Sequence, residues 1–187
     1  MPIAIAHLVS LSPYSQSDFI ASKKEDNESD LDWERRVWRE RIHGRDGLVY
    51  IPATQFGAAI KGAAAYLTQR VPGTGGKGTF RKHFDSGVFV YEDLLLDVRV
   101  EEVEGEWLML PSNPNNPKSG RVPKCMPRIA AWEGTVQYTI YDAIITEAIF
   151  AETLRISGIQ MGLGRFRPEK KGIYGRYEVK ELLWSTT

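Results

Sequence analysis

Cysteine is almost absent from this chain of 187 residues, which contains one, Cys125. A single thiol cannot close an internal disulfide, and it cannot supply the cysteine cluster of a structural zinc site. The sequence therefore excludes a disulfide-stapled extracellular scaffold and a cysteine-rich zinc module. We interpret Cys125 as a thiol without a chemical role, and a reducing cytoplasm fits this usage.

Long apolar runs are also missing, and no stretch approaches the roughly 20 residues that a membrane-spanning helix needs. This absence predicts a protein without a membrane partner. Residues 1–9 are apolar but have no basic segment ahead of them, so we interpret them as a first strand rather than a signal peptide.

Neither sign of charge is in excess, because 24 lysines and arginines balance 24 aspartates and glutamates. A uniformly basic surface is excluded, but a local basic track is not. Acidic residues concentrate in 25–34 and 92–106, whereas basic residues concentrate in 61–82, 118–128 and 165–176. Such blocks are either solvated faces or parts of one track. Segregated charge on a neutral chain also suits head-to-tail self-association, in which an acidic face meets a basic one.

Residues with catalytic or metal-binding chemistry are sparse. The three histidines, His7, His43 and His83, do not have metal-ligand spacing. His83 precedes Asp85, which suggests an acid–base pair, but no nucleophile or oxyanion motif accompanies it. We therefore predict no metal, no cofactor and no catalytic residue, and thus a protein that is not an enzyme.

The pattern of apolar residues predicts an ordered series of strands and helices. The series is a strand over 1–12, a helix that begins at Ser29 or Asp30, a short strand over 47–53, a helix over 56–67, a hairpin of 89–103 with 106–110, a strand over 132–141, a helix over 147–157 ended by Gly158, and a strand over 175–184. The polar stretches 13–29 and 111–127 are predicted to be projecting loops that order on a partner.

Without its insertions, this series consists of two strand–helix–strand halves. It predicts an α+β fold: a ferredoxin-like, RRM-type antiparallel sheet with both helices on one face. We expect one domain over residues 1–187, with insertions at about 13–46 and 72–128. Domains of this type use the free sheet face, or its rim, to bind single-stranded RNA.

Two segments resemble motifs of a known family. Residues 51–63, IPATQFGAAIKGA, resemble the segment that opens the first helix of the repeat-associated (RAMP) superfamily. Residues 158–168, GIQMGLGRFRP, followed by 172–179, GIYGRYEV, resemble its C-terminal glycine-rich loop and closing strand. Within this superfamily the chain looks most similar to the Cas7 group, whose subunits line CRISPR RNA as a filament. It departs from the pattern at Thr54, Gln55 and Gly57.

The resemblance implies a non-catalytic subunit that binds RNA or another single strand and oligomerises along it, as in the backbone of a CRISPR antiviral effector. Its partners would be single-stranded RNA or DNA and copies of itself or other CRISPR subunits. The alternative is a protein–protein interaction module, such as a phage-encoded Cas7-like mimic. Some Cas7-like proteins cut RNA with an acidic loop residue, but we interpret Asp18, Asp26, Glu28 and Asp30 as loop and helix-capping residues.

The glycine-rich segment carries the predicted binding site. Gly162 and Gly164 allow close backbone approach, while Arg165 and Arg167 offer forked hydrogen bonds to phosphates. Phe166, Tyr174 and Phe80 are aromatic candidates for base stacking. The predicted nucleic-acid-binding residues are Lys61, Gly162, Gly164, Arg165, Phe166, Arg167, Lys170, Lys171 and Arg176. Secondary candidates are Arg81, Lys82, Lys118, Arg121, Lys124 and Arg128.

Overall fold

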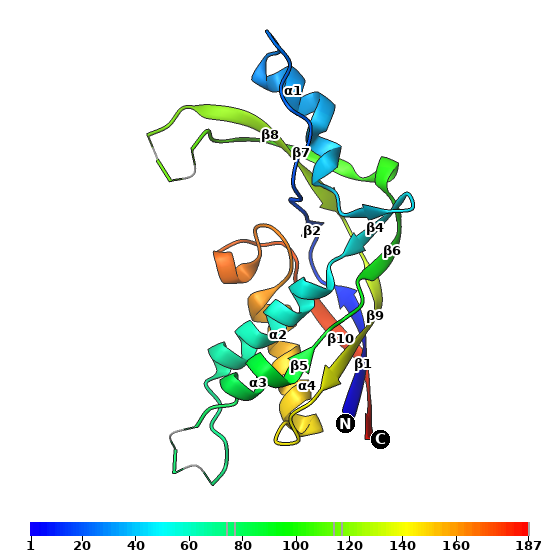
Figure 1. The fold of residues 1–187 in the computed structure, drawn as a ribbon, viewed down its shortest axis with the longest axis vertical. Helices are drawn as coiled ribbons and strands as arrows, with labels where there is room; N and C mark the ends of the chain where they lie inside the picture. The colour runs from blue at the N-terminus through cyan, green and yellow to red at the C-terminus, as the bar shows by residue number, and fades with distance from the viewer. Residues whose placement is uncertain (74, 77, 114, 117, 187) are drawn as a thin grey trace.

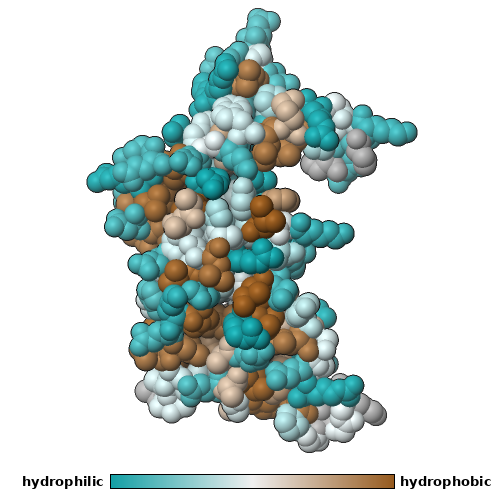
Figure 2. Space-filling model, turned by 180° about the vertical axis from the view of Figure 1, so that it is seen from behind, coloured by the Kyte–Doolittle hydropathy of each residue, from teal (hydrophilic) through white to brown (hydrophobic). Residues whose placement is uncertain are grey.

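The computed structural model describes residues 1–73, 75–76, 78–113, 115–116 and 118–186. The molecule is elongated, with the two termini side by side near one end and helix α1 (Asp30–Val37) at the other (Figure 1). Figure 2 shows the reverse side, where hydrophilic residues cover the end that carries α1 and apolar surface gathers lower down. Among the described residues, no helix is long and apolar enough to cross a membrane.

The main sheet has four antiparallel strands. They are β1 (Pro2–Ser10), β5 (Val88–Phe89), β9 (Glu133–Ile140) and β10 (Tyr177–Thr186), in the spatial order β10-β1-β9-β5. Helix α2 (Ala53–Leu67) follows β1 in the first half, and α4 (Glu147–Ile156) follows β9 in the second. With the first and last strands adjacent, this topology is the ferredoxin-like plan, which confirms the predicted fold class.

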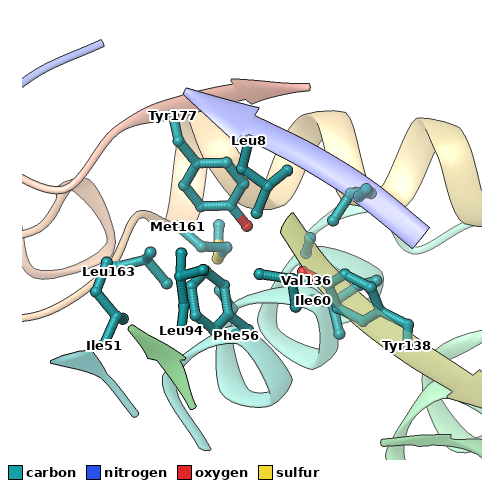
Figure 3. Close-up of a cluster of buried hydrophobic side chains, with 14 of the residues drawn as sticks. Leu8, Ile51, Phe56, Ile60, Leu94, Val136, Tyr138, Met161, Leu163 and Tyr177 are labelled. Carbon is teal, nitrogen blue, oxygen red and sulfur yellow. The ribbon is translucent and has the colours of Figure 1, made fainter. Parts of the chain in front are cut away.

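Both helices pack on one face of this sheet, as predicted. From α2, the Phe56 ring meets the Tyr177 ring of β10 at 6.5 Å, and from α4 the Phe150 ring meets Tyr138 of β9 at 5.3 Å. The alternation of β1 places Ala4, Ala6 and Leu8 in this core, fully buried. Figure 3 shows Leu8, Phe56, Ile60, Tyr138 and Tyr177 among the side chains of this cluster.

The predicted hairpin of residues 89–103 and 106–110 is wrong. Strand β6 (Leu94–Arg99) pairs with β4 (Leu48–Ile51), which also pairs with β3 (Gly44–Arg45). Strand β7 (Glu104–Pro111) pairs instead with β8 (Arg121–Ile129). A 3-10 turn over Val100–Glu102 separates β6 from β7. Strand periodicity indicates which residues face the core but does not indicate the pairing partner.

The two predicted loops are shorter than expected. Strand β2 (Tyr14–Ser15) pairs with β8, and both of its residues are fully buried, as is the following Gln16. Residues 121–127 belong to β8, so the loop at the end of the β7–β8 hairpin is limited to 112–120. Pro114 and Pro117 of that predicted loop, and Thr74 and Lys77 of the predicted insertion 72–128, lie outside the described residues.

A buried ion network attaches the α1 segment to strand β8. The Ser29 side chain caps α1, as predicted, and the helix continues into a 3-10 turn over Trp38–Arg41. Glu34, fully buried, accepts hydrogen bonds from Arg41 Nη1 at 2.6 Å and Nη2 at 3.2 Å. The same carboxylate accepts the Cys125 N–H at 2.7 Å and pairs with Lys124 Nζ at 3.3 Å. Burial raises the pKa of the Cys125 thiol to about 11, which fits an unreactive cysteine.

Candidate nucleic-acid interface

A cleft of about 570 Å³ lies where the start of α2 meets the glycine-rich loop. It brings together the two segments that carry the family resemblance, although they are far apart in the sequence. Its lining residues are Ser17, His43, Thr54, Gln55, Ala58, Ala59, Gly162, Leu163, Gly164, Arg165, Arg167 and Glu169.

The glycine-rich loop is held firmly against the body of the protein. The prediction that Gly158 ends helix α4 is wrong. The helix continues through a π-helical turn over Ser157–Met161 and ends at Gly162, whose φ is +69°. Leu163 then points into the core beside Met161 and Ile51 (Figure 3). The Arg165 N–H donates to the Ser15 carbonyl at 2.8 Å. These contacts fix this wall of the cleft before any ligand binds.

Substituting Gly164 with alanine should disturb this wall. Gly164 has a φ of +70°, and an added Cβ would overlap the Ser15 carbonyl oxygen and the Tyr14 ring. We expect a loss of about 1–3 kcal/mol in the free energy of unfolding, measured by urea denaturation. Gly57→Ala is the control, because a Cβ there meets nothing within 4 Å. That change should stabilise this helix position by about 1 kcal/mol. Equal stability of the two variants would contradict the account.

Arg165 and Arg167 both line the cleft, and both already have carboxylate partners. Arg165 Nη2 lies 3.3 Å from Glu106 Oε2, and its Nε donates to Ser15 Oγ at 3.2 Å. Burial lowers the pKa of the Arg165 guanidinium, which nonetheless keeps its charge. Arg167 Nε donates to Glu169 Oε2 at 2.9 Å. A phosphate entering the cleft would compete with these carboxylates for the same donors.

The other predicted residues lie outside the cleft lining. Lys61 lies further along α2, with Nζ 4.7 Å from the centre of the Phe89 ring. Phe166 is half exposed and packs edge-on against Tyr174 at 5.8 Å. Lys170 and Lys171 are exposed at the next turn of the loop. Arg176 uses its guanidinium within the fold, donating from Nε to the Ile159 carbonyl at 3.2 Å.

The secondary candidates divide between two places. Arg81 and Lys82 open helix α3 (Arg81–Gly87), which the sequence analysis did not predict because seven residues are too few to show a helical period. Phe80, just before it, is buried and cannot stack on a base. The remaining four belong to the β7–β8 hairpin and its tip. Of these, Lys118 is exposed, Arg121 donates to the Met109 carbonyl, Lys124 pairs with Glu34, and Arg128 pairs with Glu104.

Several cleft residues were missed by the sequence analysis. His43 lines the cleft, and its Nδ1 lies 3.0 Å from Asp18 Oδ2, which orients the ring. Thr54 and Gln55 belong to the first turn of α2, where the partial positive charge of the helix end favours anions. Asp93 already accepts the Ala53 N–H there at 2.9 Å, and this bond lowers the pKa of its carboxyl group. No sequence pattern relates these positions to the glycine-rich loop.

The two central strands of the main sheet lack the usual chemistry for strand binding. Strands β1 and β9 contain no lysine or arginine, and their one aromatic residue, Tyr138, is buried under the helices. The open face instead carries residues such as Ile5, Gln137 and Leu183, which are opposite one another in the register. Of the two surfaces that RRM-type domains use, the rim with its cleft is the better candidate.

Within the described part of the chain, no group of three or more histidine, cysteine, aspartate or glutamate side chains could hold a metal ion. The groups that line the cleft, namely two arginines, the Thr54 hydroxyl, the Gln55 amide and the start of α2, have the chemistry that holds anions by hydrogen bonds.

Comparison with known proteins gave structural matches only. No family model matches the sequence, and no curated protein is significantly similar to it. The crystal structure of Cmr6 from Pyrococcus furiosus matches with a TM-score of 0.49 and 13% identity, over 96% of this chain and 99% of that one. A cryo-EM structure of the Type III-B Cmr-beta complex bound to cognate target RNA matches with a TM-score of 0.48 and 10% identity. That match covers 98% of this chain and 60% of the other. Both matches extend over nearly the whole of this chain, at low sequence identity.

Proposed function

We propose that this chain is a non-catalytic subunit that binds single-stranded RNA, or another single strand, by its sugar–phosphate backbone and assembles head to tail along it. Its partners would be copies of itself or the subunits of a cytoplasmic CRISPR effector. The observation that carries the proposal is the cleft between the start of α2 and the glycine-rich loop. Side chains on both of its walls are hydrogen-bond donors of the kind that bind phosphate.

The chemistry of the cleft favours phosphate over base recognition. Arg165 and Arg167 present forked donors from one wall, and Thr54 presents a hydroxyl from the other. Contacts of this kind position a strand without reading its sequence. Binding should therefore be similar for unrelated sequences and should weaken as salt is added.

The carboxylates that pair with Arg165 and Arg167 should compete with RNA phosphates for these side chains and so weaken RNA binding. Replacing Glu169 with glutamine removes one competitor, since Glu169 holds Arg167 at 2.7 Å. We expect affinity for a labelled, unstructured RNA to rise about two- to fivefold, the scale of a partly exposed ion pair. Fluorescence anisotropy at low salt is the measurement.

Glu152→Gln provides the matched control for that experiment. Glu152 forms a comparable pair with Arg155 at 2.9 Å on α4, and it does not line the cleft. Its replacement should leave RNA affinity unchanged. An equal gain in both variants would show a general charge effect, and a loss of affinity in Glu169→Gln would contradict the competition.

The second candidate function is a protein–protein interaction module. It is favoured by the exposed apolar residues of the β7–β8 hairpin, Trp107 and Met109, which are 47% and 53% exposed. Tryptophan and methionine are enriched at protein interfaces. If the wild-type protein binds neither RNA nor single-stranded DNA at low salt, this reading replaces the first.

A further inference from the structure

An aromatic cluster lies at the edge of the main sheet where β5 ends. Phe89 is the last residue of β5, Tyr91 lies two residues further on, and Tyr141 directly follows β9. The Phe89 and Tyr91 rings are nearly parallel, 13° apart in plane and 6.2 Å between centres, while Tyr141 meets Phe89 edge-on at 5.8 Å. Tyr91 is 65% exposed and Tyr141 55%. Two large rings are thus presented to solvent rather than used in the core.

The cluster is held in one arrangement. The Tyr91 and Tyr141 hydroxyls are 3.0 Å apart and share a hydrogen bond, and the Tyr141 N–H donates to the Gly87 carbonyl at 2.8 Å. Rings that are fixed before binding lose little conformational freedom when a ligand stacks on them. The exposed rings therefore form a pre-organised platform.

Positive charge borders this platform. Lys61 Nζ lies over the Phe89 ring at 4.7 Å, and α3 beside it contributes Arg81 and Lys82. Asp85 pairs with Arg81 at 3.7 Å and Asp142 pairs with His83 at 2.6 Å. Within the described residues, neither Lys61 nor Lys82 forms an ion pair with a carboxylate. Glu92, which follows Tyr91 in the sequence, is exposed. Aromatic faces beside unpaired lysines suit a ligand with flat rings and negative charge.

The platform is connected to the cleft along α2. Thr54 and Ala58 line the cleft, and Lys61 follows them at helical spacings of seven and three residues. Seven residues of α-helix cover roughly 10 Å, so a chain leaving the cleft over the small side chain of Ala58 reaches Lys61 within a short distance.

We infer that Tyr91 and Tyr141 form a base-stacking subsite for the same single strand whose backbone the cleft binds. Lys61 would hold a phosphate between the two places, and the rings would receive an unpaired base. The inference rests on the proposed function and extends it, since it predicts a minimum strand length for full affinity. Stacking of this kind accepts any base, because every base has an aromatic face.

The test compares Tyr91→Ala/Tyr141→Ala with Tyr91→Phe/Tyr141→Phe, using single-stranded RNA homopolymers of increasing length. Loss of one stacked base should weaken binding of the longer strands by about 5- to 150-fold. Strands too short to leave the cleft should bind both variants as they bind the wild type. The phenylalanine variant keeps the rings and should retain the affinity for long strands. Both residues are exposed, and circular dichroism with thermal unfolding checks that each variant folds.

The outcomes separate this inference from the proposed function. If the wild type binds no strand of any length, both the proposed function and the stacking subsite are wrong, and the wild-type measurement alone is enough to show this. If the wild type binds but the alanine variant binds every length equally well, the subsite is wrong and the cleft remains. If the phenylalanine variant loses as much affinity as the alanine variant, stacking is not the cause. A variant that loses self-association without losing strand affinity would assign the cluster to an interface between copies.

Discussion

Replacing Glu34 with alanine should lower the free energy of unfolding by about 3–5 kcal/mol, the usual cost of removing one partner from a buried ion pair. The carboxylate is fully buried and accepts from Arg41 at two positions, and it also satisfies the Cys125 N–H and pairs with Lys124. Without it, Arg41, itself only 6% exposed, loses its carboxylate partner in a place with little water. Urea denaturation, followed by tryptophan fluorescence, measures the loss.

Glu28→Ala is the matched control for this prediction. Glu28 also pairs with an arginine, since Arg36 Nη2 lies 2.7 Å from its carboxylate, and this hydrogen bond lowers the pKa of Glu28 to about 2. The Glu28 side chain is 12% exposed and that of Arg36 is 39% exposed, so water and salt screen this pair more than the buried pair of Glu34 and Arg41. We expect a much smaller loss of stability than for Glu34→Ala. Comparable losses from the two substitutions would contradict the assignment of Glu34 as the group that holds α1 to β8.

Replacing Arg165 and Arg167 together with alanine should weaken RNA binding by about 100-fold or more. Each arginine contributes charge-assisted hydrogen bonds to phosphate, worth roughly 1.5–3 kcal/mol apiece. The loss should be the same for unrelated sequences if, as proposed, both side chains contact the backbone of the strand. Arg155→Ala is the control, since Arg155 pairs with Glu152 on α4 outside the cleft. A loss confined to one RNA sequence would indicate base reading instead.

The core of the fold could be predicted from local sequence patterns. Helices α2 and α4 repeat apolar residues at helical spacing and so show their buried faces directly. Strand β1 is apolar at most positions, so its sequence predicts a strand but not which face is buried. The order of these elements then allows few topologies, and the ferredoxin-like plan is one of them. The pairing of β7 with β8 rather than β6 depends on contacts that no local pattern encodes.

The candidate site was predictable in part, for a similar reason. The glycines and arginines of the loop lie in one short segment, and the structure places Gly162, Gly164, Arg165 and Arg167 around the cleft. Arg176, from the same basic block, instead donates to backbone carbonyls. Composition alone cannot distinguish an arginine that lines the cleft from one that donates to the backbone. The carboxylates Glu106 and Glu169 and the pair of His43 with Asp18 enter the site only through the folded structure.

The most direct test of the central claim is a salt titration of RNA binding by the wild type and by the Arg165→Ala/Arg167→Ala variant. Each phosphate contact to a single strand contributes about 0.7 to the slope of log affinity against log salt concentration. The account predicts that the wild-type affinity falls linearly on this plot and that the variant's slope is shallower by about 1.4, for two lost contacts. Equal slopes for the two proteins, or no binding by the wild type at low salt, would contradict it.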